Sequence, residues 1–132
     1  MKQSNFRFSN PFISKIEYQM NHEFEHQDEL TISNSFNVNI ARDPDENIAI
    51  VDLRIVIGKK EELKKLPFYI DVIITAMFNW DDVYDDTTVQ SLLSINAPAL
   101  LLGYARPLVA TITNMSPFPT YNLPFYNFTE EE

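Results

Sequence analysis

In the stretch from Phe68 to Trp80, FYIDVIITAMFNW, every second residue is apolar, and the residues between them include polar ones. Successive side chains of a strand point to opposite faces, so this pattern predicts a long strand with one face on a core and the other half-solvated. The predicted half-solvated face carries Tyr69, Asp71, Ile73, Thr75, Met77 and Asn79. A strand of this length needs neighbours, and the sequence before it supplies three.

Three earlier segments carry the same period of two residues. Phe12 to Phe24 alternates loosely, whereas SFNVNIA places Phe36, Val38 and Ile40 cleanly on one face. The turn DPDEN, residues 43–47, then leads into a strand that ends at Gly58. The charged segment KKEELKKL, residues 59–66, is expected to be a solvated connection with one helical turn. We therefore predict four antiparallel strands within residues 12–80.

The last third of the chain carries helical patterns. A short helix is expected from Thr88 to Ser94, and Asn96 is expected to cap a second, long helix. In that helix an apolar stripe recurs every three or four residues and should lie on the sheet. The stripe comprises Leu101, Ala105, Leu108, Ile112 and Met115. The run is not expected to span a membrane, because Arg106 and two prolines interrupt it and a bilayer requires about 18 to 20 apolar residues.

The predicted organisation is one α+β domain over residues 1–132. It consists of an N-terminal arm (1–11), an antiparallel sheet (12–80), a short and a long helix (87–115) and an extended tail (116–132). The tail, SPFPTYNLPFYNF and beyond, is rich in proline and aromatic residues. That much aromatic area is costly to leave in water, so the tail should lie on a surface.

Composition excludes several functions. The net charge of −9 disfavours nucleic acid and anionic lipid, which require clustered Lys and Arg. The absence of cysteine removes disulfides and thiolate chemistry, and two glycines are too few for a phosphate-binding loop. The first sixteen residues, MKQSNFRFSNPFISKI, contain no continuous apolar segment typical of an export signal, so we expect a cytoplasmic protein.

One catalytic motif occurs literally. The segment HEFEH, from His22 to His26, matches the H-E-x-x-H pattern of zinc hydrolases. That pattern requires a helix, yet these residues continue a strand-like alternation, and no third histidine follows. We expect no enzyme activity, no catalytic metal and no cofactor. The acidic segment DDVYDD is expected to be a solvated loop.

The C-terminal third resembles a known family. GYARPLVATITNMSPFPTYNLPFYNF resembles the end of SecB, the protein-export chaperone, whose pattern is close to PYAR, a helix, and then FPxLNLxPVNF. The matching residues are Tyr104, Ala105, Arg106, Phe118, Pro119, Asn122, Leu123, Pro124, Asn127 and Phe128. Pro107 stands where the family has an acidic residue, and the chain stops four residues after NF.

The resemblance implies an ATP-independent chaperone that binds unfolded or precursor polypeptides in apolar grooves. It also implies a homotetramer, a dimer of dimers, in which the long helix is partly core and partly contact between copies. The predicted groove residues are Phe36, Phe78, Trp80, Tyr84, Leu92, Leu101 and Tyr121, each of which could also be plain core. By position, Glu25, Tyr69 and Asp71 correspond to residues through which the family docks the SecA translocase motor.

Two functions stay open at this point. One is a holding chaperone for many clients; the other is a SecB-fold protein dedicated to one partner, such as an antitoxin. Shallow apolar pockets suit the first, because burial of about 25 cal/mol per Å² rewards any apolar segment. Aromatic side chains suit such promiscuity as well.

Overall fold

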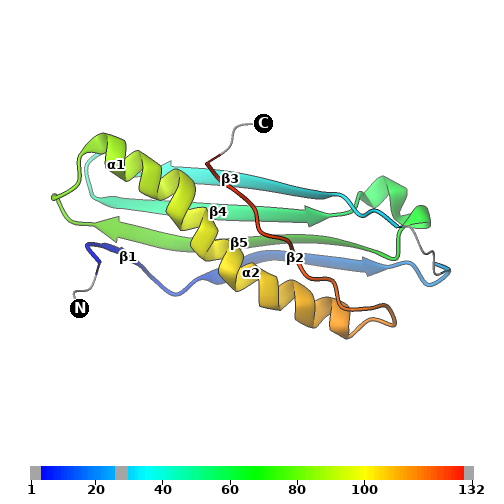
Figure 1. The fold of residues 1–132 in the computed structure, drawn as a ribbon. Coiled ribbons are helices and arrows are strands. Elements are labelled where there is room, and N and C mark those ends of the chain that lie inside the picture. The colour runs from blue at the N-terminus through cyan, green and yellow to red at the C-terminus, as the bar shows by residue number, and fades with distance from the viewer. Residues whose placement is uncertain (1–3, 26–29, 130–132) are drawn as a thin grey trace.

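A computed structural model gives the fold for residues 4–25 and 30–129 (Figure 1). Five strands form one antiparallel sheet, and a helical segment and the C-terminal tail cross the same face of it. The strands are β1 (Phe6–Phe8), β2 (Phe12–Met20), β3 (Asn34–Arg42), β4 (Ile48–Ile57) and β5 (Phe68–Trp80). The α+β architecture is confirmed, with one strand more than the four expected.

The additional strand, β1, lies in the predicted N-terminal arm. It pairs with the end of β5, placing Phe6 opposite Trp80 and Phe8 opposite Phe78. β2 pairs with the remainder of β5, so these two short strands together line one side of the long one. On the other side β5 pairs with β4 and β4 with β3, which leaves β1 and β2 at one edge and β3 at the other.

Strand register confirms the predicted faces of β5. Val72 lies opposite Ile55, and Ile74 lies opposite Leu53, so the apolar rows of β4 and β5 share the helix-covered face. β2 departs from simple alternation, because a bulge between Ile13 and Lys15 shifts its register. The strand also ends at Met20, before the expected Phe24.

The connection between β4 and β5 is a 3-10 turn, η1 (Lys60–Lys65), in agreement with the expected charged helical turn. Gly58 starts this connection with φ of +80°, a conformation that side chains with a Cβ rarely adopt. A Cβ there would also lie 3.2 Å from the carbonyl oxygen of Phe68. Glycine is therefore required where β4 turns towards β5.

The helices are continuous rather than separate. Helix α1 (Asp86–Ser91) runs through a π-helical turn (Leu92–Asn96) into α2 (Ala97–Asn114). Asn96 has helical backbone angles and makes no capping bond, so its predicted role as a cap is wrong. The true cap is Asp85, whose side chain accepts a hydrogen bond from the Thr88 N–H at 2.8 Å. The π-helical turn lies immediately before the first turn of α2, which contains Pro98. Proline has no backbone N–H to donate to a carbonyl oxygen one turn earlier.

The helical segment Asp86–Asn114 is 29 residues long and apolar enough, by length and composition, to cross a membrane. In this fold its apolar stripe instead covers the sheet diagonally (Figure 1). Leu101 and Ala105 of the predicted stripe are fully buried against the sheet, together with Val109, which was not predicted. Leu108 and Ile112 are half-buried and Met115 is 86% exposed, so the stripe is confirmed only in part. Pro107 lies within α2 on its exposed side.

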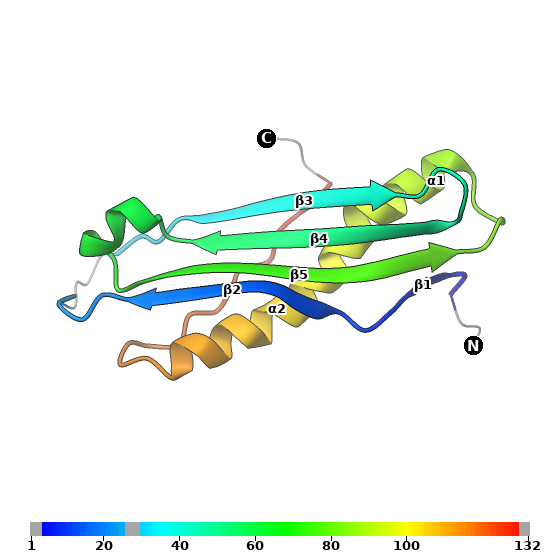
Figure 2. The same cartoon turned by 180° about the vertical axis from the view of Figure 1, so that it is seen from behind.

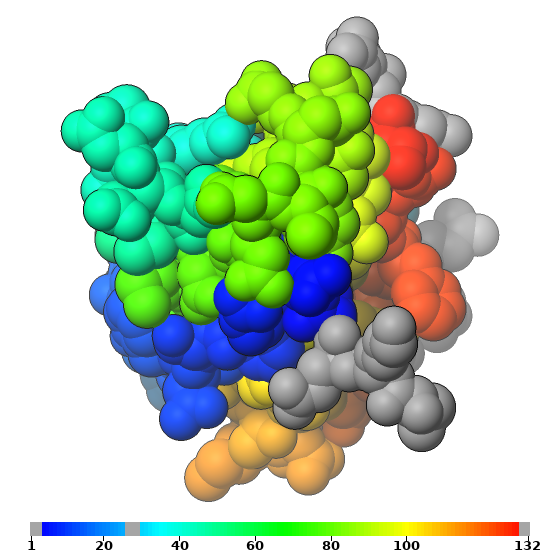
Figure 3. Space-filling model, turned by 90° about the vertical axis from the view of Figure 1, so that its left-hand side faces the viewer, coloured from blue at the N-terminus to red at the C-terminus, as the bar shows by residue number. Residues whose placement is uncertain are grey.

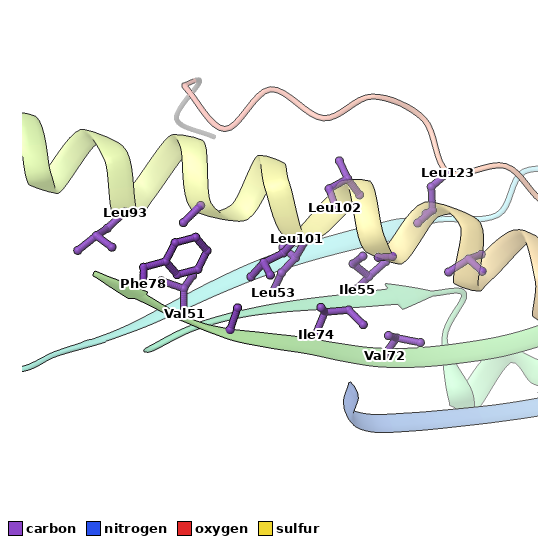
Figure 4. Close-up of a cluster of buried hydrophobic side chains, with 14 of the residues drawn as sticks. Val51, Leu53, Ile55, Val72, Ile74, Phe78, Leu93, Leu101, Leu102 and Leu123 are labelled. Atoms are coloured by element: carbon purple, nitrogen blue, oxygen red, sulfur yellow. The ribbon is translucent and has the colours of Figure 1, made fainter. Parts of the chain in front are cut away.

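The core lies between this helix and the sheet (Figure 4). Leu101 of α2 points at Leu53 of β4, and Leu123 of the tail approaches from the other side of the helix. Large, fully buried side chains fill the layer: Phe68, Phe78, Leu53, Ile55, Ile57, Ile70, Leu93, Leu101 and Leu123. The opposite face of the sheet is covered by no helix (Figure 2).

One end of the sheet is closed by three chain segments that lie side by side (Figure 3). Arg7 of β1 forms an ion pair with Asp81 at 2.8 Å, and Asn47 of the β3–β4 turn donates to Asp82 at 2.6 Å. These contacts join the N-terminal strand, the hairpin turn and the acidic loop after β5. The loop DDVYDD is thus partly engaged rather than simply solvated.

Candidate functional site

The C-terminal tail crosses the helix-covered face of the sheet in an extended conformation (Figure 1). Residues 117–129 make no backbone–backbone hydrogen bond to another described residue. Side chains hold the tail instead. The Leu123 side chain is fully buried in the core, and Arg106 of α2 donates its Nε–H to the Leu123 carbonyl oxygen at 3.1 Å.

Tyr121 fixes the tail at a second point. Its backbone N–H donates to the Thr113 hydroxyl oxygen at 2.8 Å, and its phenol hydroxyl donates to Asn34 Oδ1 of β3 at 2.8 Å. The ring also meets Phe68 edge to face, with centroids 6.0 Å apart. The tail is therefore an extended apolar segment held by its own side chains and by hydrogen bonds between its backbone and side chains of α2.

The tail passes over β3 and forms one wall of an apolar surface, which we call the β3 shelf. It consists of Phe36, Val38 and Ile40 on the helix side of β3, flanked by the π-helical turn and by Tyr126 of the tail. Tyr126 stacks on Phe36 with ring centroids 4.3 Å apart. Val38 remains 37% exposed between these neighbours, so the shelf has apolar area still in contact with water.

A second apolar surface lies on the other side of α2, along β2. A hollow of about 210 Å³ there is lined by Pro11, Phe12, Ile13, Ile74, Tyr104 and Leu108. Ile16 and Tyr18 continue the exposed apolar row along β2. We call this surface the β2 groove. It joins an unpaired strand edge to the half-buried stripe of the long helix.

The structure divides the predicted groove residues into two groups. Phe78, Trp80 and Leu101 are core residues, with Trp80 only 5% exposed beneath Phe6 and Arg42. Their predicted contact with clients is therefore wrong for the folded chain, because the helix and β1 cover them. Phe36, Tyr84, Leu92 and Tyr121 are half-buried, and of these Phe36 belongs to the β3 shelf.

The predicted translocase-docking residues do not form an exposed acidic patch. Asp71 lies on the uncovered face of the sheet, yet its side chain is only 1% exposed. Arg54 donates to both of its carboxylate oxygens, at 3.0 and 2.7 Å, and Lys15 lies 2.7 Å away. The Arg54 hydrogen bond holds the pKa of Asp71 below its ordinary value, against the opposing effect of burial.

The neighbours of Asp71 on this face are similarly engaged. Tyr69 is buried, and Glu17 forms an ion pair with Lys60 at 2.8 Å. Glu25 is exposed but lies in the connection after β2, outside this network. The expectation that Asp71 is an exposed charge is wrong, because the cross-strand register brings Arg54 and Lys15 to it.

The HEFEH motif has no helical geometry in the part the structure describes. His22 and Glu23 lie in a turn after β2, and His26 lies outside the described residues. Within residues 4–25 and 30–129, no group of three His, Asp or Glu side chains is arranged to hold a metal.

Sequence reasoning did not single out Tyr126 or Val38 as parts of a shared surface. Tyr126 sits in a tail without periodicity, so no pattern assigns it a partner. Val38 does alternate with Phe36 and Ile40, and that row is the signal that β3 presents an apolar side to the helix layer. The alternation in β3 does not indicate how much of the Phe36, Val38 and Ile40 row the tail covers.

Comparisons with known proteins agree with this geometry. Residues 4–130 match the family described as preprotein translocase subunit SecB. An uncharacterized protein of Methanocaldococcus jannaschii is 29% identical over 122 residues, which cover 92% of this chain and 78% of that protein.

Two solved structures share the fold. The SecB-like chaperone Rv1957 of Mycobacterium tuberculosis, solved with a ChAD peptide from the antitoxin HigA1, aligns with a TM-score of 0.75 at 13% identity. That alignment covers 93% of this chain and 91% of Rv1957. A protein of unknown function from Streptococcus agalactiae aligns with a TM-score of 0.59 at 19% identity, over 94% of this chain and 100% of that one. The family match over nearly the whole described chain, together with a helix and tail laid across one face of an antiparallel sheet, identifies this protein as a member of the SecB family.

Proposed function

We propose that the protein is an ATP-independent chaperone that holds unfolded or precursor polypeptides by binding extended apolar segments on the β3 shelf. It is not an enzyme in this proposal and uses no cofactor. Its clients are cytoplasmic polypeptides, consistent with the expected location. The match to the SecB family and the structural likeness to the SecB-like chaperone Rv1957 support this class of function.

The tail is the observation that carries the proposal. It is an extended segment with prolines and aromatics, and it lies on the sheet through Tyr121, Leu123 and Tyr126 without backbone pairing to described residues. A surface that binds such a segment through apolar contacts and a few hydrogen bonds to its backbone places few demands on sequence. Apolar client segments have the same chemistry, and each buried Å² of apolar area contributes about 25 cal/mol.

The proposal predicts the effect of one charge placed on the shelf. Val38→Glu puts a carboxylate on exposed apolar area beside Phe36, so suppression of aggregation of an unrelated, chemically unfolded protein should fall at least fivefold. Ile50→Glu is the matched control, because Ile50 is 48% exposed on the opposite face of the sheet. Both variants should keep the parent circular dichroism spectrum.

Two results would remove the proposal. One is a parent protein that fails to suppress aggregation of several unrelated unfolded proteins. The other is an equal loss in the Val38→Glu and Ile50→Glu variants, which would indicate that added charge, and not the shelf, matters.

A second candidate is a protein dedicated to a single partner such as an antitoxin. The complex of Rv1957 with an antitoxin peptide favours it. The same aggregation assay separates the two candidates, since a dedicated protein should protect one partner and leave unrelated clients unprotected. Docking of SecA through Asp71 is not part of either proposal, because that carboxylate is buried and paired.

We also propose that copies of the chain associate through the β2 groove, as a dimer or as a dimer of dimers. The groove combines an unpaired strand edge with the exposed side of α2, including Tyr104 and Leu108. Association there would leave the β3 shelf, at the opposite edge of the sheet, open to clients.

A further inference from the structure

The outer edge of β3 carries unpaired backbone groups in a regular row. β3 is the last strand of the sheet, and no described strand pairs with its outer side (Figure 2). All nine of its residues pair with β4 in unbroken register. The edge is therefore straight and long enough for another strand.

The hydrogen bonds at the two ends of the β3–β4 ladder show which groups face outward. Asp43 donates to Ile48 at 3.0 Å, and Gly58 donates to Ser33 at 2.8 Å. Bonded pairs in an antiparallel ladder recur at every second residue, so the odd-numbered residues of β3 bond to β4. The N–H and C=O groups of Phe36, Val38 and Ile40 consequently point away from β4, and no hydrogen bond to them is found in the described part of the chain.

β3 lacks the features with which proteins usually protect an edge strand. Its sequence, NSFNVNIAR, contains no proline, no lysine and no bulge. β2, the opposite edge, has both a bulge at Ser14 and Lys15 beside it. An unprotected edge of nine residues is a template for a further strand.

The side chains around this edge favour an extended client over a second copy of the chain. On the helix side the edge offers the β3 shelf, of which Val38 alone is a large apolar side chain more than a third exposed. On the other side it offers the uncharged side chains of Ser35, Asn37 and Asn39. Permanent contacts between copies bury large apolar areas. The β2 groove, with exposed Phe12, Ile13, Ile16 and Tyr18, offers far more exposed apolar area than the β3 edge does.

We propose that an unfolded client segment binds as an additional strand on the outer edge of β3. Its alternate N–H and C=O groups pair with those of Phe36, Val38 and Ile40, and its alternate apolar side chains lie on the β3 shelf. Backbone hydrogen bonds are the same for every sequence except at proline, so this mode explains how one site accepts many clients. The inference rests on the proposed function and adds the way in which the client is held.

The test uses a fluorescent nine-residue peptide that alternates Val with Thr, together with two backbone N-methylated forms. One form is methylated at the Val amides and the other at the Thr amides. A strand added to one edge pairs only alternate amides with its host, so one methylated form should bind at least tenfold more weakly and the other within about threefold of the parent peptide. Equal binding of all three peptides, or equal loss in both methylated forms, would overturn strand addition.

Two variants of the protein address the same point. Val38→Pro removes an outward N–H without removing a bond to β4 and should weaken binding of the unmethylated peptide at least tenfold. Val38→Thr keeps the N–H and the shape of the side chain and should lose at most threefold. If Val38→Pro does not fold, the methylated peptides still decide the question.

The remaining outcomes are also decisive. A parent protein that suppresses aggregation but does not distinguish the methylated peptides keeps the proposed function and loses strand addition. A parent protein that binds neither peptide nor unfolded protein loses both. A change in molecular mass of Val38→Pro with unchanged peptide affinity would make the β3 edge a contact between copies and overturn the inference.

Discussion

Arg54 covers the carboxylate of Asp71 with a two-point ion pair on a sheet face that no helix protects. The two residues come from neighbouring strands, and Lys15 from a third strand completes the cluster. Because the Arg54 hydrogen bond lowers the pKa of Asp71 in the folded protein, folding favours the ionised carboxylate. The resulting stabilisation is present above the ordinary pKa of an aspartate and is lost as the pH falls through the lowered value.

Asp71→Asn should remove this acid sensitivity. At pH 7 the free energy of unfolding should fall by about 1–3 kcal/mol, since Arg54 and Lys15 lose a charged acceptor. Between about pH 5 and pH 3 the variant should lose less further stability than the parent. Urea unfolding at a series of pH values measures both effects, with exposed Asp45→Asn as the control; the same acid slope in parent and Asp71→Asn would contradict the assignment.

Trp80→Ala should act on stability before it acts on client binding. Trp80 is buried beneath Phe6 and beside Arg42, so truncation should cost about 3–5 kcal/mol of unfolding free energy. Denaturant unfolding monitored by circular dichroism measures the loss. If the Trp80→Ala protein keeps the stability of the parent but binds clients more weakly, Trp80 is a client-binding residue and not a core residue.

Leu123→Ala should release the tail from the core. The side chain is fully buried and its carbonyl oxygen accepts from Arg106, so the variant should lose about 2–4 kcal/mol of unfolding free energy. Proteolysis within residues 117–129 should become faster as well. Exposed Asn122→Ala is the control and should match the parent; equal cleavage rates in both variants would mean that Leu123 does not anchor the tail.

Association of copies should depend on the β2 groove. Light scattering at micromolar concentration should give the mass of a dimer or tetramer, and Leu108→Glu should lower that mass because it places a charge in an apolar contact. Ile50→Glu, on the uncovered face, should leave the mass unchanged. A monomeric parent protein would contradict the prediction.

No stoichiometric zinc is expected on the purified protein. His22 lies in a turn, and the HEFEH motif lacks the helix that would align two histidines on one metal. Elemental analysis of protein prepared without chelator tests this. One zinc per chain that disappears in His22→Ala would reverse the conclusion.

The sequence predicted the parts of the fold that depend on periodicity. The faces of β4 and β5 follow from alternation. The spacing of three and four residues identified Leu101 and Ala105 in the buried stripe of α2 but not Val109. β1 was missed because three residues are too few to show a period, and the bulge at Ser14 leaves no mark in composition.

The site was less predictable because it depends on which strands become neighbours. Asp71 reads as an exposed acid until the register places Arg54 and Lys15 beside it. Phe78 and Trp80 read as groove residues until β1 and the helix cover them. Phe36 lies half-buried on the β3 shelf, but its partner Tyr126 comes from a segment without a pattern.

The position of Leu123 in the core has a consequence for synthesis of the protein. The last strand ends at Trp80, yet the core is complete only when Leu123 arrives, 123 − 80 = 43 residues later. At about 5–20 residues per second, the ribosome needs about 2 to 9 seconds to add that stretch. During this interval the helix and then the tail arrive in turn, so the apolar face of the nascent sheet is incompletely covered, and a newly made chain itself exposes the kind of surface that the finished protein is proposed to bind.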